Sequence, residues 1–290
     1  MFYANRVTLF LLCLSIGITL NSCKTNIERK KEMNNQKDLE KNKGQFTAFD
    51  NAGIPVIIEW QKTTFFAPEF ANIMKAAWPI ARDAYTEVEM QFLRAHPEIV
   101  NTEDVGAKEF YMPFRPLFKN GLKVVDWIKV KEVMQSALKP HFIFDASTWG
   151  PEVRAMFAND ACYSITIKDL QTKTLRGFIT FMIRSSYASG DVKMMISGVD
   201  ENYLNRDLDK LLMSSILKIN SDIKRICTCI RVTNASALKI YKSWGFTNTD
   251  NPILDHPHNF QHWIFLEYKT DKSNLLQKTA SSFVDLSSEK

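Results

Sequence analysis

The chain has 290 residues, with 45% hydrophobic and 24% charged side chains, a balance that is ordinary for a globular protein. Its length allows one large domain or two small ones, and 20 phenylalanines and 6 tryptophans supply ample material for a core. The formal net charge of +5 is too small to indicate a nucleic-acid-binding protein.

The first 23 residues do not read as part of a folded domain. The apolar run at residues 7–20 is shorter than the roughly 20 residues that span a bilayer, and it is typical of a signal-peptide core. Residues 20–23 (LNSC) resemble a bacterial lipoprotein cleavage site, which implies that Cys23 receives lipid. We therefore expect residues 1–23 to be a signal peptide and the protein to be lipid-anchored in the cell envelope. An unprocessed N-terminus is the alternative, and it would leave the domain in the cytoplasm.

The first half of the chain predicts one strand and several helices. Residues 24–50 are polar and rich in lysine, which predicts a charged flexible tether. A strand is expected at residues 53–60, and apolar side chains spaced three and four apart predict a long helix at residues 68–93. Residues 101–119 are irregular and aromatic, and we expect a loop that packs on the domain or covers an acceptor site. Two further helices are expected, at residues 124–138 and 149–157.

The second half predicts a sheet that is interrupted by two helices. Short runs of β-branched and apolar residues predict strands at residues 162–168, 175–184, 191–199, 226–232 and 260–269. A helix is expected at residues 207–219 and another between the last two strands. Together these elements predict one domain over residues 51–270, followed by a polar tail at residues 271–290.

The most informative stretch is residues 234–246, NASALKIYKSWGF. Asn234 is a good N-cap, because its short side chain can accept the first unpaired N–H groups of a helix. Gly245 can adopt a positive φ and is expected to end that helix. Spacings of three and four place four side chains on one helical face, namely Ala237, Ile240, Tyr241 and Trp244.

The spacing N-x-x-A-x-x-x-Y-x-x-x-G-F resembles the strand–helix signature near the C-terminus of the GNAT N-acetyltransferase superfamily. The resemblance covers about residues 51–269 and implies an α/β fold with a GNAT-like mixed, mostly antiparallel central sheet flanked by helices. It implies that two neighbouring strands splay apart and that acetyl-coenzyme A binds between them, facing Asn234 and Ala237. It also implies that Tyr241 protonates the thiolate of the departing coenzyme A, which a buried phenol can do. Core packing is the plain alternative for such a helix.

The second signature of the family, Q/R-x-x-G-x-G/A, falls on residues 204–209 and departs from the pattern. Its glycines let backbone N–H groups close on the coenzyme A diphosphate at a helix N-terminus. Here Leu204 stands where Gln or Arg is expected, and Asp207 and Asp209 replace the glycines. A carboxylate within about 5 Å of a diphosphate costs on the order of 1–3 kcal/mol. Arg206 and Lys210 could offset part of this cost, or both aspartates could point outward as cap and first-turn residues. The resemblance assigns cofactor binding here to Val199, Leu204, Asn205, Arg206, Asp207, Leu208, Asp209 and Lys210.

The chemistry of this family also needs an oxyanion donor and a base. The backbone of residues 196–199 is expected to supply the donor, with Gly198 easing a β-bulge. Asp200 and Glu201 are the candidate bases, although exposed acids at strand ends are common. His256, His258 and His262 match a zinc site poorly, so no metal is expected. Asp255 or His258 could contact the acceptor.

The sequence therefore predicts a GNAT-type acyltransferase that moves an acetyl group from acetyl-CoA to an amine acceptor by direct attack. The alternative is a degenerate domain of the same fold, a binding or scaffold module of the envelope without catalysis. The missing glycines favour this alternative. The expected partners are acetyl-CoA, an amine that the sequence does not identify and, if Cys23 is processed, the membrane.

Overall fold

The computed structural model describes residues 42–64, 67–103, 110–119, 121, 124–138, 160–184, 187–250, 262–270, 276, 279–280 and 282–285. The predictions for residues 1–23, for the helix at residues 149–157 and for Asp255, His256 and His258 lie outside this part of the chain.

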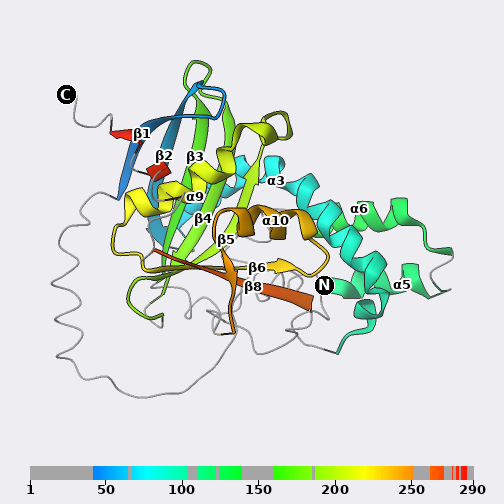
Figure 1. The fold of residues 1–290 in the computed structure, drawn as a ribbon. Helices are drawn as coiled ribbons and strands as arrows, with labels where there is room; N and C mark the ends of the chain where they lie inside the picture. Colours follow the sequence, from blue (N-terminus) through cyan, green and yellow to red (C-terminus); the bar gives the residue numbers. More distant parts are fainter. Residues whose placement is uncertain are drawn as a thin grey trace.

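The described part of the chain forms a nine-stranded sheet in the order β7-β8-β6-β5-β4-β3-β2-β1-β9 (Figure 1). Its strands are β1 (Lys43–Phe49), β2 (Pro55–Thr64), β3 (Ala161–Asp169), β4 (Leu175–Ile183), β5 (Asp191–Val199), β6 (Arg225–Arg231), β7 (Thr247–Asn248), β8 (Trp263–Lys269) and β9 (Val284–Asp285). Neighbouring strands are antiparallel except β5 and β6, which are parallel. The predicted fold class, a mixed and mostly antiparallel sheet flanked by helices, is confirmed.

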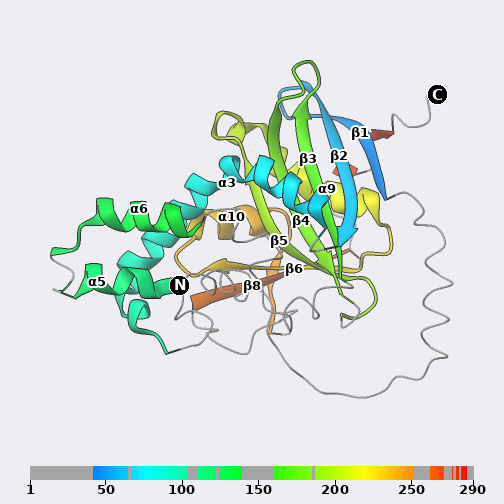
Figure 2. The ribbon, with the colours of Figure 1, turned by 180° about the vertical axis from the view of Figure 1, so that it is seen from behind.

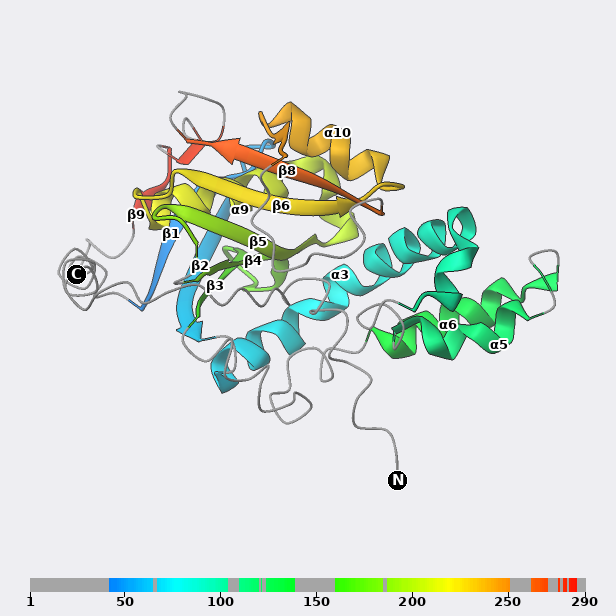
Figure 3. The same cartoon turned by 90° about the horizontal axis from the view of Figure 1, so that it is seen from below.

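The helices lie on both faces of this sheet. They are α3 (Pro68–Ala95), η1 (Pro97–Asn101), η2 (Met112–Phe114), α5 (Arg115–Phe118), α6 (Trp127–Ala137), η5 (Glu201–Arg206), α9 (Leu208–Ile219) and α10 (Ala235–Ser243). Helix α3 crosses one face, while α9 and α10 cover the other (Figure 2). Helices α5 and α6 pack beside the C-terminal half of α3, away from the sheet (Figure 3). None of the described helices is both long and apolar enough to cross a membrane.

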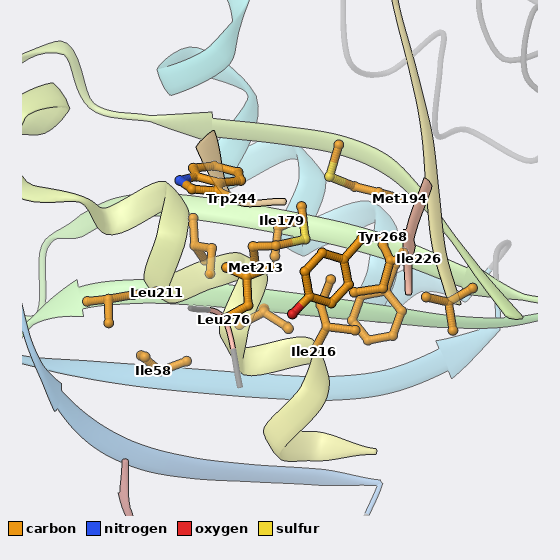
Figure 4. Packing of buried hydrophobic residues seen from close by; sticks show 14 of the residues in the cluster. Ile58, Ile179, Met194, Leu211, Met213, Ile216, Ile226, Trp244, Tyr268 and Leu276 are labelled. Atoms are coloured by element: carbon orange, nitrogen blue, oxygen red, sulfur yellow. The ribbon is translucent and has the colours of Figure 1, made fainter. Parts of the chain in front are cut away.

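Two hydrophobic cores follow from this arrangement. Between α3 and the sheet, Phe70 and Trp78 of the helix pack against Phe178 of β4. On the other face, the apolar side of α9 packs against the sheet, where Met213 and Ile216 lie near Ile179 (Figure 4). The alternation of side chains along each strand supplies both cores, because successive residues point to opposite faces.

The strands expected at residues 162–168, 175–184, 191–199 and 226–232 are β3 to β6, each end within one residue of its expected place. Two expectations were wrong at the ends of the domain. Lys43–Phe49, expected in the tether, forms β1, and Val284–Asp285, expected in the polar tail, forms β9 beside it. Phe46 of β1 stacks on Phe283 with ring centroids 5.0 Å apart, so one apolar contact joins the two ends.

Candidate active site

Strands β5 and β6 pair over only part of their length. Their register joins Asp191 to Arg225, Val192 to Ile226 and Lys193 to Cys227, and it stops there. At the paired end, the Arg225 guanidinium donates to Asp191 of β5 and, at 3.3 Å, to Glu267 of β8. Beyond Lys193 the two strands diverge, which confirms the predicted splay.

A cavity of about 250 Å³ lies where the strands diverge. Strand β5 contributes Met194, Met195, Ile196 and Ser197, and β6 contributes Thr228, Cys229, Ile230 and Arg231. Helix α3 contributes Ala84, Tyr85, Val88 and Glu89, the region of α10 contributes Asn234, Ala237 and Tyr241, and Phe110, Tyr111 and Trp263 complete the wall. The cavity therefore passes through the sheet plane and receives side chains from helices on both faces.

Tyr241 lies in this cavity and is only 8% exposed. Its ring makes edge contacts with Trp244 at 5.4 Å and with Phe246 at 5.3 Å. Its hydroxyl donates to Met194 Sδ at 3.7 Å, a weak acceptor that a better one can displace. Burial raises the pKa of Tyr241, and the Ser197 hydroxyl offsets only part of this rise. The phenol is therefore neutral at neutral pH and can act as a proton donor.

Both ends of α10 have the predicted geometry. Asn234 is the N-cap, and its side chain accepts the Ala237 N–H at 3.1 Å. At the other end Gly245 has a φ of 100°, and the Phe246 N–H donates to the Tyr241 carbonyl at 3.1 Å. This is the 6→1 bond of a Schellman motif, the Gly245 N–H makes the 5→2 bond to the Lys242 carbonyl, and together they fix the backbone at Tyr241. Ile240 departs from the predicted buried face, because it is 41% exposed.

The bulge in β5 is not where the sequence predicted it. The pairing with β4 goes from Phe181–Met194 directly to Thr180–Ile196, so that Met195 is the extra residue. Gly198 serves another purpose: a Cβ there would lie 2.8 Å from the Ala81 Cβ. Glycine is required at position 198 because α3 packs so closely on the strand. The bulge instead distorts the backbone at Met195, and Met195 lines the cavity.

Sequence reasoning missed a buried ion pair in the cavity wall. Arg231 Nε donates to Glu89 Oε1 at 2.8 Å, and an Arg231 Nη donates to Glu89 Oε2 at 3.0 Å and to the Tyr111 hydroxyl at 2.9 Å. The guanidinium lies between the rings of Phe92 and Trp263, 4.1 Å from each centroid. The available signal was Glu89 itself, a carboxylate between Tyr85 and Phe92 on an otherwise apolar helical stripe.

The two candidate bases are not among the described residues that line the cavity. Asp200 accepts the Asn202 N–H at 3.0 Å as the N-cap of η5, and Arg176 donates to its carboxylate at 3.1 Å. Burial raises the pKa of Asp200, but hydrogen bonds from Asn202 and Arg176 outweigh this effect and lower the pKa overall. Glu201 is exposed. A base role for either residue stays a prediction.

The expected diphosphate segment keeps an unusual backbone without its glycines. Asp207 stands at the first glycine position with a φ of 53°, in the left-handed region that glycine favours. Leu204 is 63% exposed, and the Asn205 carbonyl accepts Asn51 Nδ2 at 2.8 Å. Val199 ends β5 and Leu208 begins α9, so both flank the segment as predicted. The segment thus has one left-handed residue, with a carboxylate where a glycine was expected.

The charges of this segment are largely engaged by other groups. Arg206 donates to Asp50 at 3.1 Å, and its guanidinium lies over the Tyr203 ring at 4.8 Å. Arg206 therefore cannot offset the negative charge of Asp207 and Asp209 without leaving its ion pair with Asp50. Asp209 accepts the N–H of Lys210 at 2.9 Å, one of the first-turn donors that a diphosphate would use. Burial, followed by the charge of Asp207, raises the pKa of Asp209.

No group of three or more His, Cys, Asp or Glu side chains within the described ranges is arranged to hold a metal ion. His262, which does fall within those ranges, is 6% exposed and packs against Phe92 at 5.2 Å. Burial lowers its pKa, and His96 and Arg231 lower it further.

No family model and no curated protein sequence matches this chain. Several solved structures are similar to it. The similarity to a GNAT-family acetyltransferase of Staphylococcus aureus Mu50 has 16% identity, covers 41% of this chain and 74% of that one, and has a TM-score of 0.33. PaiA N-acetyltransferase of Thermoplasma acidophilum, solved with coenzyme A, is 14% identical to this chain. The similarity covers 73% of this chain and 98% of that one, with a TM-score of 0.33. NAA60 of Arabidopsis thaliana, solved with a bisubstrate analogue, is 21% identical to this chain. The similarity covers 42% of this chain and 83% of that one, with a TM-score of 0.30. At these values the likeness assigns no activity to this chain, and the case for a function comes from its own residues.

Proposed function

We propose that this protein is a GNAT-type N-acetyltransferase that moves an acetyl group from acetyl-CoA to an amine. The observation that carries the proposal is the gap between β5 and β6, with the Tyr241 hydroxyl inside it. Diverging strands leave backbone groups without strand partners, and a pantetheine arm carries amides that can pair with them. The cavity of about 250 Å³ is below the roughly 300–1,000 Å³ of typical ligand pockets, so it suits a slender chain.

The reaction follows from this placement. The amine nitrogen attacks the thioester carbonyl carbon, and the carbon–sulfur bond breaks with its electron pair left on sulfur. Tyr241 then gives its proton to that sulfur, because a neutral phenol stabilises a developing thiolate better than water does. The proton lost by the amine passes to a base; the sequence offers Asp200 and Glu201 for this role, and neither is among the described residues that line the cavity. Asn234 stays occupied by its cap hydrogen bond, so its part in binding is to shape the wall of the cavity.

The diphosphate of the cofactor would lie outside the cavity, against η5 and the start of α9. Asp207 there has the left-handed backbone that glycine favours, but Asp207 and Asp209 bring negative charge. We therefore propose that acetyl-CoA binds chiefly through its pantetheine arm, with weaker affinity than a glycine-containing loop would give.

Titration calorimetry of the full chain with acetyl-CoA is the first test. We expect binding, and we expect release of coenzyme A thiol when alkyl, aralkyl, polyamine and amino-acid amines are offered. Tyr241→Phe should keep the binding and lose at least 100-fold in turnover. Absence of binding at millimolar acetyl-CoA would remove the enzymatic proposal and leave the noncatalytic binding module that the sequence also allows.

We propose separately that Cys23 is lipidated and that the protein is anchored in a bacterial cell envelope. The basis is the LNSC sequence at residues 20–23 behind an apolar run. Cells fed a labelled fatty acid should label the chain, and Cys23→Ser should remove the label. An unlabelled wild-type chain would overturn this proposal without bearing on catalysis.

A further inference from the structure

Tyr85 enters the same cavity as Tyr241, but from the opposite face of the sheet. Tyr85 belongs to α3 and Tyr241 to α10, and these helices lie on the two sides of the sheet (Figure 3). Because β5 and β6 diverge, the two phenols can meet through the sheet plane. They are close enough that the charge of one raises the pKa of the other.

Ser197 of β5 contacts both phenols. Its backbone lowers the pKa of Tyr85, as an N–H close to a phenol oxygen would. Its side chain lowers the pKa of Tyr241 as well.

The Tyr85 O–H has no acceptor among the residues that the structure describes. Burial raises the pKa of Tyr85 to about 12, so the group carries its proton at neutral pH. Its ring stacks on Trp78 at 5.7 Å, and Trp78 is 1% exposed, so the donor is held in place. A fixed, protonated donor without an acceptor in a cavity is a binding group for a ligand oxygen.

We propose that Tyr85 is a second hydrogen-bond donor of the reaction, and that its O–H binds the carbonyl oxygen of the thioester while Tyr241 serves the sulfur. This inference rests on the proposed acetyl transfer. A thioester in the cavity would then lie between a donor from α3 and a donor from α10. The backbone at the Met195 bulge lies on the same strand, two residues from Ser197, and can add a second donor to the oxygen.

The two phenols have different tasks in this scheme. When the amine attacks, the carbonyl π electrons move onto oxygen, and Tyr85 stabilises this oxyanion by a hydrogen bond while it keeps its proton. When the oxyanion collapses, the carbon–sulfur bond breaks and the Tyr241 proton passes to sulfur. The amine proton leaves through the base to solvent, from which Tyr241 is protonated again.

The test is the infrared carbonyl band of bound acetyl-CoA labelled with ¹³C at the thioester carbonyl. A hydrogen bond weakens the C=O bond, so the band of the wild-type complex should lie at lower wavenumber than in water-free reference solvent. Tyr85→Phe should move the band back, while Tyr241→Phe should leave it in place. Tyr85→Phe should also lower kcat about 100-fold, as removal of an oxyanion donor does, with KM for acetyl-CoA within threefold.

Tyr163→Phe is the matched control, because Tyr163 is another tyrosine whose pKa burial raises to about 12, in the core on the α9 face. It should change neither the band nor kcat. A band that stays in place in Tyr85→Phe with acetyl-CoA bound would overturn the role of Tyr85 and leave the proposed function intact. Absence of acetyl-CoA binding to the wild type would overturn both.

Discussion

Arg231 donates two hydrogen bonds to Glu89, at 2.8 and 3.0 Å, and so ties the diverging end of β6 to α3. At the paired end of the same strand, Arg225 bonds to Asp191 of β5 and Glu267 of β8. Each end of β6 is thus held by an arginine with a different partner, β5 at one end and α3 at the other. This difference accounts physically for a gap that stays open in a sheet whose other strands pair along their length.

Removal of Glu89 should be strongly destabilising. Glu89 is 2% exposed, and Glu89→Ala would leave the buried Arg231 charge without its main partner. We expect a loss of about 3–5 kcal/mol in the free energy of unfolding, measured by urea denaturation. Glu87→Ala on the same helix is the control, because Glu87 pairs with Lys131 at 2.6 Å but is 49% exposed and should cost under about 1 kcal/mol. Equal losses from the two variants would contradict a structural role for the buried pair.

Asp207→Gly should improve both stability and cofactor binding. The left-handed φ of 53° costs a non-glycine residue about 1–2 kcal/mol, and the greater freedom of unfolded glycine returns about 0.5–1 kcal/mol of this. We expect a net gain of about 0.5–1 kcal/mol in stability. The affinity for coenzyme A should rise about tenfold, because a carboxylate no longer faces the diphosphate.

Lys173→Gly provides the control for this variant. Lys173 is the other non-glycine residue with positive φ in the described part of the chain, at 59°, in the turn between β3 and β4. It should gain similar stability without any change in affinity for coenzyme A. An unchanged affinity in Asp207→Gly would show that the diphosphate does not approach this loop.

Local signals in the sequence were enough to predict α10 and the strands around it. Asn234 caps the helix, Gly245 ends it with a positive φ, and Tyr241 faces the cavity because local hydrogen bonds fix the backbone at both ends. These contacts join residues a few positions apart, which is why a motif can carry them.

Contacts between residues far apart in the sequence were not predictable in the same way. Glu89 and Arg231 form a site wall only because α3 crosses the open end of β6, and no local pattern encodes that crossing. Strand β1 was not predicted, because alternate residues in it are mostly polar and its sequence looks like part of the tether. Its strand structure depends on pairing with β2 and β9. The bulge at Met195 was misplaced to Gly198, because the close approach of Ala81 that requires this glycine cannot be read from β5 alone.

High pH should destabilise the protein through its buried tyrosines. Burial raises the pKa of Tyr85 and of Tyr163 to about 12 and raises that of Tyr241. Above pH 10, unfolded tyrosines lose their protons while these three keep them in the folded state, so the folded state binds more protons and stability falls as pH rises. The slope should be about 1.4 kcal/mol per pH unit for each such tyrosine up to its folded pKa. Urea unfolding between pH 9 and about 12 measures it, and Tyr163→Phe should make the slope shallower; an unchanged slope would contradict the raised pKa.

The identity of the base can be tested at the end of β5. Asp200→Asn removes the charge that pairs with Arg176 but keeps a good N-cap for η5, so it should cost under about 1 kcal/mol in stability. Because Asp200 has a lowered pKa and is held by these contacts outside the cavity wall, we expect turnover to change by less than about threefold. Glu201→Gln, exposed and without that ion pair, is the companion variant. A loss of 100-fold or more in either one, together with loss of the acidic limb of the pH–rate profile, would identify that carboxylate as the base. If both variants keep their turnover and the pH profile, neither carboxylate is the base that takes the amine proton.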